Sequence, residues 1–441
     1  MMNFINTLKD IFKIEELKNK ILLTIGLIAV YRFMASVPLP GIDPLQLSAL
    51  KESTSGGLLG LLNAFTGGAF ARASVMALGI MPYISASIVV QLMGIAVPYL
   101  QKLQKDGESG RKKITQITRW LTIGITLVQA PTYITAIKTQ FGLGPEAFLV
   151  PGLTFWISSI IILTAGTIFA MWLGERITDK GVGNGISLLI TVGIIANFPA
   201  AFLQEFLAKT TNAGAGGLMM VLIEIIVWFV VILLTVLLVT AVRKIAVQYA
   251  RRTVAGNIQN VAGSRDYIPL KLNAAGVMPI IFAQAIMFLP MALGQKFPAL
   301  IGLTDPFGWQ YNVIFALLII IFSFFYTAIT IPTNKMAEDL KRSGGFIPGI
   351  RPGKDTAEKL DSVLSRITFP GSLFLAALSI LPAVVVQFGV QQGWAMFYGG
   401  TSLIIMVGVA IDTMQQINSY LLNRHYDGLM KPGNSNRKSN K

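Results

Sequence analysis

Side chains that could carry acid–base, redox or metal chemistry are scarce in the apolar parts of this sequence. There is no cysteine, and the one histidine, His425, lies in the polar carboxyl-terminal tail. Glu224 and Asp412 fall inside long apolar stretches, and neither has an obvious second carboxylate, histidine or base in register. The sequence GVGNG at Gly181–Gly185 lacks the lysine of a phosphate-binding loop and is typical of a turn that begins a helix. We therefore predict no catalytic residues, no metal site and no cofactor.

Branched apolar side chains recur at helical spacing in two of the apolar stretches. Ile84 and Ile88 are four residues apart, and Ile186 and Ile190 repeat that spacing. Residues four apart share one face of a helix. A ring of such side chains could line a pore, but isoleucine is common in any helix that faces lipid. The spacing alone leaves both interpretations open.

Residues 56–92 hold six glycines and one proline, Pro82, in an otherwise apolar sequence. The first part, residues 56–70, is too short to cross a membrane, whereas the second, residues 74–92, is long enough and has Pro82 in its interior. A broken helix is tolerated at membrane depth only where protein or a water-filled cavity covers the freed backbone groups. We predict a short half-helix folded into a cavity, followed by a full span that lines this cavity.

The composition is that of a polytopic membrane protein. Apolar residues make up 53% of the chain and charged residues 13%, against about 25% charged in soluble domains. Ten apolar stretches approach the ~20 residues that cross a bilayer. They are residues 21–37, 74–97, 117–137, 153–173, 186–203, 217–242, 274–293, 313–331, 367–388 and 394–417.

The placement of positive charge supports this count of ten spans. With ten spans both termini share one side, and the basic stretches 1–32, 102–119, 176–180, 243–271, 335–366 and the tail fall there too. Of the 36 lysines and arginines, the other side receives only Lys51, Arg72, Lys138, Lys209 and Lys296. Lysine and arginine concentrate in cytoplasmic loops. Both termini are therefore predicted to be cytoplasmic.

Two predicted cytoplasmic loops are long and basic. Residues 243–271 have β-branched and aromatic residues around glycine and asparagine, which favours a hairpin. Residues 333–366 have a Gly/Pro-rich tip between two polar stretches with helical character. Loops of this length are usually functional. Their charge would suit docking on an anionic body such as ribosomal RNA, although it could also serve only to fix topology.

Six sequence motifs resemble those of the SecY family, the channel subunit of the bacterial Sec protein translocase. The likeness extends over nearly the whole chain. The motifs are VPLPGID at 37–43, ALGIMPYISASIVVQLM at 77–93, GERITDKGVGNGISLLI at 174–190, KLNAAGVMPIIFA at 271–283, FIPGIRPG at 346–353 and YGGTSLIIMVGVAID at 398–412.

The resemblance implies an all-α fold of ten transmembrane helices in two pseudosymmetric halves around an hourglass pore. The expected parts are a cytoplasmic segment (1–20), an amino-terminal half with spans one to five (21–210), a carboxyl-terminal half with spans six to ten (211–417) and a cytoplasmic tail (418–441). The half-helix at about 57–70 would be a plug. The halves would hinge on the external side and open laterally to lipid between spans two and three and spans seven and eight.

The resemblance also implies roles for individual residues. The pore ring would be formed by Ile84, Ile88, Ile186, Ile190, Ile281 and Ile405. The plug would include Gly57, Leu58, Leu59, Gly60, Leu61, Leu62, Asn63, Ala64 and Phe65. A polar cluster at the lateral gate would include Asn273, which we pair with Gln91. Docking would involve Arg351, together with Arg243, Arg251, Arg252 and Arg265.

The implied function is a passive protein-conducting channel in the bacterial inner membrane. Its expected partners are SecE, SecG, the ATPase SecA, the ribosome, anionic membrane lipid, and the signal sequences and polypeptides that it translocates. A secondary transporter of a small solute is the alternative, because transporters also use broken helices and repeats. A buried relay of ionisable residues would favour the transporter, and a convergent acid, base or nucleophile set would favour a membrane-embedded enzyme. The sequence shows neither.

Overall fold

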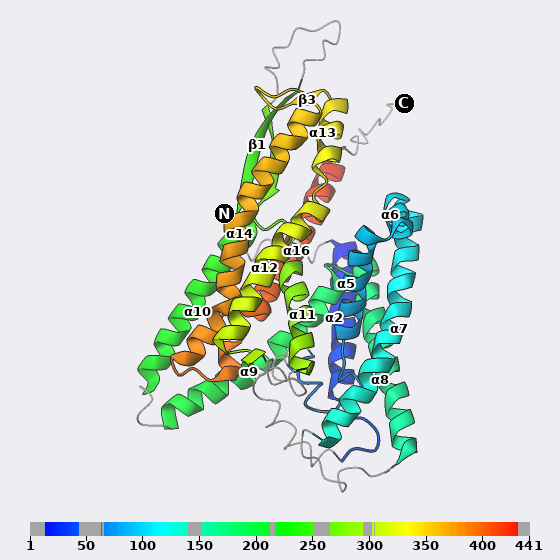
Figure 1. Cartoon of the computed structure of the whole chain (residues 1–441), viewed down its shortest axis with the longest axis vertical. Coiled ribbons are helices and arrows are strands. Elements are labelled where there is room, and N and C mark those ends of the chain that lie inside the picture. The colour runs from blue at the N-terminus through cyan, green and yellow to red at the C-terminus, as the bar shows by residue number, and fades with distance from the viewer. Residues whose placement is uncertain are drawn as a thin grey trace, which may run out of the picture. The chain divides into compact units, whose positions relative to one another are not determined.

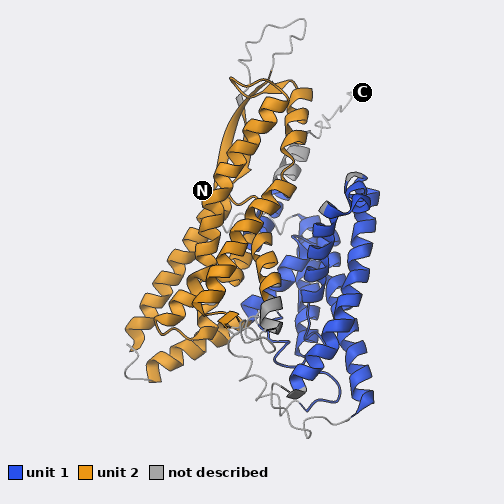
Figure 2. Cartoon of the chain, in the orientation of Figure 1, with its two compact units in different colours: residues 1–53, 63–196, 409–441 blue, residues 54–62, 197–408 orange. Residues whose placement is uncertain are grey.

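The computed structural model describes residues 14–43, 63, 66–139, 152–211, 217–249, 265–293, 302–303 and 305–430 (Figure 1). Contacts divide the chain into two compact units (Figure 2). Unit 1 comprises residues 1–53, 63–196 and 409–441, and unit 2 comprises residues 54–62 and 197–408. Two long helices, α9 (Gly185–Thr211) and α16 (Gly400–Met430), contribute to both units.

Unit 1 is a bundle of long apolar helices. Besides the first part of α9 and the later part of α16, it contains α2 (Glu15–Ser36), α5 (Met81–Ala96), α6 (Pro98–Lys105), α7 (Gly107–Thr139) and α8 (Leu153–Lys180). Helix α7 packs against both α5 and α8, and α2 also packs against α8. Large apolar side chains such as Val128 and Ile161 point outward and are 72% and 62% exposed, which is typical of a lipid-facing surface.

Three helix ends lie together in unit 1: the start of α2, the start of α9 and the end of α16. A chain with ten spans would have all three on the same side of the membrane. Leu17 near the start of α2 and Val182 before α9 form a buried cluster with Ile417 and Leu421 of α16. Lys20 also donates a hydrogen bond of 3.4 Å to the hydroxyl of Tyr420. Because α16 is the last span, its end lies on the same side as the start of α2.

Arg32 lies at the opposite end of α2 from Lys20. It stands four residues before the end of the helix at Ser36. Assigning it to the same side as the amino terminus was therefore wrong, because that assignment assumed a span beginning only at residue 21 and ignored how far the helix had already run. The bias of the remaining basic residues is unchanged.

Unit 2 combines apolar helices with a small sheet. It contains α10 (Gly217–Thr240), β1 (Val242–Tyr249), β2 (Arg265–Lys271), α11 (Met278–Leu293), α12 (Trp309–Thr330), α13 (Thr333–Arg342), β3 (Gly345–Phe346), α14 (Lys354–Gln387) and α15 (Gln392–Ala395). Helix α12 packs against α11 on one side and α14 on the other. Apart from Glu224, helix α10 is apolar around its circumference, as expected of a helix surrounded by lipid and protein.

The two basic loops fold as the sequence predicted and join in one module. Strands β1 and β2 form an antiparallel hairpin in which Val242 pairs with Lys271 and Gln248 with Arg265. The second loop contributes α13, the start of α14 and the short strand β3, giving the sheet order β2-β1-β3. Val247, Ile347 and Leu360 are the buried core that holds the hairpin to the second loop.

The described residues are consistent with ten spans without reproducing the count fully. Eight helices are long and apolar enough to cross a membrane. The pair α5 and α6, bent by 101°, makes a ninth if it is counted as one span. Helix α11 is apolar but has only 16 residues in this structure, and it occupies the place of the remaining predicted span.

Three predicted boundaries were wrong. The second span begins at Met81 rather than Ser74, since residues 74–80 form turns. Pro82 therefore lies in the first turn of α5, where its missing N–H costs nothing, and not in a helix interior. The seventh span likewise begins at Met278 rather than Ala274. Helix α9 continues through Pro199 to Thr211, past the predicted end at residue 203.

Candidate functional site

Four of the six predicted ring residues lie on two helices that contribute to unit 1. Ile84 and Ile88 occupy one face of α5, and Ile186 and Ile190 occupy one face of α9. Within each pair the first residue is half-buried and the second is buried, with exposed fractions of 6% for Ile88 and 4% for Ile190. The two pairs are therefore alike in residue type and in the burial of each member.

The other two ring residues, Ile281 and Ile405, belong to unit 2 and occupy equivalent places in a sequence repeat. Gly79-Ile80-Met81-Pro82 is repeated as Gly276-Val277-Met278-Pro279, so that Ile84 corresponds to Ile281. The sequence GISLLI at 185–190 is repeated as GTSLII at 400–405, so that Ile190 corresponds to Ile405. The repeat could have been read from the sequence, and it was the signal that we missed.

The repeated glycines determine where these helices begin. Gly79 and Gly276 have φ angles of +54° and +63°, a conformation that favours glycine, and a 16-residue helix begins two residues after each. Helices α9 and α16 begin at Gly185 and Gly400 themselves. Asn184 caps α9, because its Oδ1 accepts the N–H groups of Ile186 (3.1 Å) and Ser187 (3.3 Å). The interpretation of GVGNG as a helix-start turn is confirmed.

The predicted plug lies almost wholly outside the described residues. Of its nine residues only Asn63 is described; Gly57, Leu58, Leu59, Gly60, Leu61, Leu62, Ala64 and Phe65 are not. From Thr66 onward the chain is described and buried, with Thr66 2%, Ala69 0% and Phe70 7% exposed. The carboxyl end of the segment is therefore a packed part of unit 1.

The two predicted gate residues stand in different units, and each has its own local setting. Asn273 is buried and lies in the turn that precedes α11, where its carbonyl accepts the N–H of Gly276. Gln91 lies in α5 and its Nε2 donates to Ser87 Oγ at 3.3 Å within the same helix. Their pairing stays a prediction.

The predicted docking residues lie on the sheet module or in a part outside the description. Arg243 is exposed on β1, and Arg265 opens β2. Arg351 is exposed at the tip before α14, and this tip is fixed because Ile347 and Ile350 pack in the core of the module. Arg251 and Arg252 lie outside the described residues.

Unit 2 contains a buried charged cluster that the sequence analysis missed. Lys209 Nζ lies 3.7 Å from Glu205 Oε1 and 3.5 Å from Glu224 Oε1, and all three side chains are at most 7% exposed. Lys209 also donates to the Gly389 carbonyl at 2.9 Å, and Glu205 Oε2 accepts the N–H of Gln391 at 2.8 Å. Glu224 therefore has partners, and the statement that it has none in register was wrong.

The missed cluster had a readable signal. Glu205 and Lys209 are four residues apart, a spacing that pairs side chains on a helix. We had ended the fifth span at residue 203, which placed both residues in a loop. The cluster joins the end of α9 to α10 and to the segment after α14. It lies beside an aromatic group formed by Phe198, Phe202, Trp228, Trp394 and Phe397.

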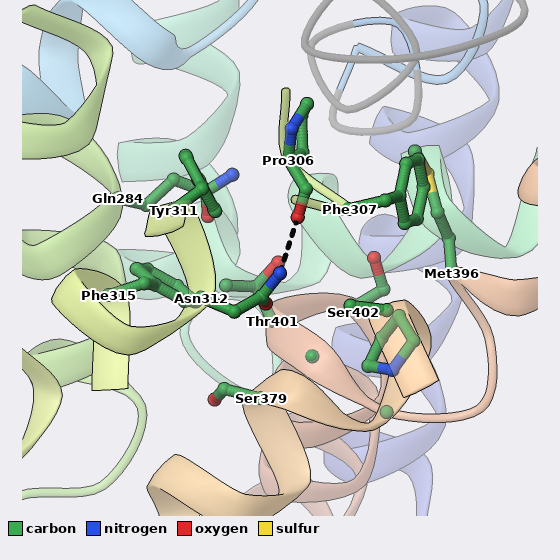
Figure 3. Close-up of a pocket in the computed structure, with 14 residues that line it drawn as sticks. Gln284, Pro306, Phe307, Tyr311, Asn312, Phe315, Ser379, Met396, Thr401 and Ser402 are labelled. Carbon is green, nitrogen blue, oxygen red and sulfur yellow. Dashed lines mark hydrogen bonds between the residues drawn. The ribbon is translucent and has the colours of Figure 1, made fainter. Parts of the chain in front are cut away.

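Unit 2 contains a small cavity with a mostly apolar lining (Figure 3). Its lining residues Gln284 and Thr401 are about one helical turn from the predicted ring residues Ile281 and Ile405. Its volume is about 50 Å³, and Gln284, Thr401 and Ser402 are among its polar lining residues. Asn312 Nδ2 donates to the carbonyls of Pro306 (3.0 Å) and Gly308 (2.8 Å) at its edge. A water needs about 10–15 Å³ of such space. The cavity therefore has room for a few waters.

Comparison with known proteins defines the class first. Two solved structures, one of a protein-conducting channel and one from a study of the plug domain of SecY, align with TM-scores of 0.62 and 0.63. Each alignment covers 94% of both chains at 18% and 19% identity, which shows a shared fold. This chain therefore has the multi-pass helical fold of these two structures.

The sequence comparisons then define the family. The SecY family model matches residues 74–414. The protein translocase subunits SecY of Streptomyces scabiei and Aquifex aeolicus are 39% and 38% identical to this chain. The matches cover 95% and 96% of this chain and 98% and 99% of the relatives. The chain belongs to the SecY family, and the family prediction from the six motifs is confirmed.

Proposed function

We propose that this chain conducts unfolded secretory proteins across the bacterial plasma membrane and releases transmembrane segments sideways into lipid. Family membership over nearly the full length makes it a translocase channel subunit, and this is the observation that carries the proposal. The finer assignment rests on the ring residues. Isoleucines occupy equivalent places in both copies of each repeat, as a constriction built from two related halves requires.

The chemistry of the ring suits a seal around an arbitrary polypeptide. Branched apolar side chains offer no partner to a hydrated ion, so a narrow ring of them excludes water and blocks conduction. The same side chains make no sequence-specific contact and can yield around any extended chain. The channel itself needs no catalytic group, and the energy for translocation would come from partners.

The sheet module is the proposed docking surface for those partners. Two further structures with TM-scores of 0.57 and 0.56 are described as a Sec61 complex of the canine ribosome–channel assembly and a yeast Ssh1 complex bound to the 80S ribosome. We extend the ribosome to this chain as a partner, together with SecA, because Arg351 is exposed at a rigid, basic tip. SecE would clamp the halves, SecG would bind peripherally, and anionic lipid would contact the basic loops.

The proposed orientation has both termini in the cytoplasm. The buried cluster of Leu17, Val182, Ile417 and Leu421 supports it, since it joins the start of the first span to the end of the last. The basic sheet module would then face the cytoplasm, where SecA and ribosomes are found.

A solute transporter is the weaker alternative. The buried cluster of Glu205, Lys209 and Glu224 is the kind of feature that a transporter uses. Here, however, Lys209 and Glu205 also bond to the backbone of Gly389 and Gln391, which makes the cluster a structural clamp. The comparisons give the transporter no support.

Reconstitution tests the proposed function. The purified chain, placed in vesicles with SecE and SecG, should translocate a secretory protein into a protease-protected state when SecA and ATP are added. Ribosomes and SecA should also copurify with it. Vesicles that take up no secretory protein under these conditions, although SecA binds them, would overturn the channel assignment.

A further inference from the structure

We propose that Thr24 and Gln416 are positioning residues for the pore ring. They hold the turn at residues 181–185, from which α9 starts, and so fix where Ile186 and Ile190 lie. The inference rests on the ring in the proposed function, and it assigns a role to two side chains that the sequence analysis did not select. All the residues that carry it belong to unit 1.

Two backbone N–H groups of this turn find their partners outside the two helices that the turn joins. They belong to Val182, which is 3% exposed, and to Gly183, which is also buried. A buried N–H group that loses its partner keeps the full cost of its desolvation. The turn therefore depends on side chains that other parts of the bundle supply.

Thr24 supplies the first partner from α2. It is 8% exposed, and its Oγ1 accepts the N–H of Val182 at 3.1 Å. The same hydroxyl donates to the carbonyl of Lys20 at 2.9 Å, so its proton is engaged within α2 and a lone pair remains for the turn. A Cβ added at Gly181 would overlap Thr24 Oγ1. Glycine at that position thus lets α2 approach the turn closely.

Gln416 supplies the second partner from α16. Its side-chain Oε1 accepts the N–H of Gly183 at 2.9 Å. Gly183 has a φ angle of +86°, and a Cβ added there would lie 3.0 Å from Thr413 Oγ1. Gly183 thus permits both the bend of the turn and the close approach of α16.

Apolar packing next to these two bonds keeps the three segments together. Leu17 of α2 and Val182 of the turn are buried against each other, and Ile417 and Leu421 of α16 pack on them. The residue that follows Gln416 therefore belongs to the same contact. The ends of α2 and α16 are fixed against the turn by packing as well as by hydrogen bonds.

The turn passes its position directly to the ring. Thr178 Oγ1 of α8 accepts the N–H of Gly185 at 2.9 Å, so the turn is bonded from α2, α8 and α16. Ile186 is the next residue, and Ile190 lies one helical turn further on. A shift of the turn is thus a shift of both ring residues.

The expected consequence is a change in ion tightness. A constriction lined by apolar side chains blocks ions by dewetting, and it does so only while it is narrow. A turn released from α2 or α16 would let the start of α9 move and the ring widen for part of the time. Docking of partners does not involve Thr24 or Gln416 and should be unaffected.

Resting conductance of the complete translocase in planar bilayers tests this role. Gln416→Met and Thr24→Val remove the acceptor but keep the size of the side chain. Each should raise the open probability of the resting channel about tenfold, as expected when one buried N–H group loses its partner. Gln416→Glu and Thr24→Ser retain an acceptor oxygen and should stay close to the unmodified channel. Silent Met and Val variants, or equally leaky Glu and Ser variants, would overturn the proposal.

Matched controls remove similar groups that do not bond to the turn. Gln415→Met changes the exposed neighbour of Gln416. Thr118→Val removes a buried hydroxyl of α7 that donates to the carbonyl of Ile114 in its own helix at 2.9 Å. Both controls should leave the resting conductance unchanged. Leakage from them equal to that of Gln416→Met would contradict a specific role for the two turn contacts.

A thiol reporter measures the position of the ring itself, because the natural chain has no cysteine. In an Ile186→Cys background, Gln416→Met should raise the rate of labelling by a water-soluble maleimide several-fold. A second reporter, Ser159→Cys, replaces a buried residue about 28 Å along α8 from Thr178 and should label at an unchanged rate. Equal rises at both reporters would show general loosening and would overturn the positioning role.

Serine at the four ring isoleucines of α5 and α9 tests the proposed function separately. Leakage from this ring variant, with silent Gln416→Met and Thr24→Val channels, would refute the positioning role and leave the ring intact. A silent ring variant would refute the ring, while labelling of Ile186→Cys would still decide whether Thr24 and Gln416 hold the start of α9.

Discussion

At the scale of single residues, close helix contacts depend on glycines that have no room for a side chain. A Cβ at Gly185 would overlap the carbonyl of Gly174 and lie 2.7 Å from Ile177 Cβ. The start of α9 is therefore seated directly on α8. Ile186 and Ile190 follow within the next turn and a half, so this one contact also sets where two ring residues lie.

Gly185→Ala should lower the stability of the protein and widen the gap between α8 and α9. Backbone atoms cannot move aside as a flexible side chain can, so we expect a loss of about 1–3 kcal/mol. Gly124→Ala in α7 is the matched control, since nothing lies within 4 Å of its Cβ position, and it should be neutral or slightly stabilising. Thermal unfolding in detergent measures both, and equal melting temperatures would contradict the packing argument.

At the scale of elements, the long apolar helices could be predicted from the sequence, whereas the structure does not reproduce the full count of ten spans and several boundaries were wrong. The hairpin of residues 242–271 followed from its β-branched residues and turn signals. The start of α5 did not, because residues 74–80 are as apolar as a helix. Two features keep residues 74–80 out of the helix: Ser74 pairs with the distant Pro38, and Gly79 has a positive φ angle. Such tertiary causes leave little trace in hydropathy.

Some residues of the candidate site could likewise be predicted from the sequence, and others could not. The ring positions were predicted from motifs and stay a prediction, although the internal repeat independently supports four of them. The Glu205–Lys209–Glu224 cluster could not be found once α9 was assumed to end near Pro199.

The charged cluster joins three elements, and breaking it should destabilise unit 2. Lys209→Met leaves two buried carboxylates facing each other, and we expect a loss of about 3–5 kcal/mol. Replacing all three residues, with Glu205→Gln and Glu224→Gln added, should recover much of that loss because no uncompensated charge remains. Denaturant or thermal unfolding of Lys209→Met, the triple variant and the unmodified protein measures this. A triple variant as unstable as Lys209→Met would show that packing, not charge, is the cause.

The sheet module should act as a docking element without contributing to channel folding. Arg351→Glu reverses a charge on an exposed, well-supported tip, and we expect SecA-driven translocation to fall by about tenfold or more. Lys354→Glu, an exposed charge three residues away, is the control for a general loss of positive potential. Insertion and thermal stability should be unchanged in both variants. Translocation at the rate of the unmodified protein would exclude Arg351 from the docking surface.

At the scale of the whole molecule, ion tightness and passage of protein must be reconciled in one path. The proposed ring of isoleucines would meet both demands, since such a ring dewets when empty and yields when filled. The proposed plug would supply a second barrier. The two barriers differ physically, and they should therefore fail in different ways.

Conductance in planar bilayers distinguishes these failures. Replacing Ile84, Ile88, Ile186 and Ile190 by serine should give persistent leakage, because a wider and wettable constriction loses its barrier to ions. Deleting residues 57–65 should give intermittent leakage, because the intact ring still closes between openings. Serine at Ile195, an exposed isoleucine of α9, is the control and should stay silent. If the ring variants are as silent as the unmodified channel when no polypeptide is present, these isoleucines do not line the path, and a solute transporter becomes the better explanation.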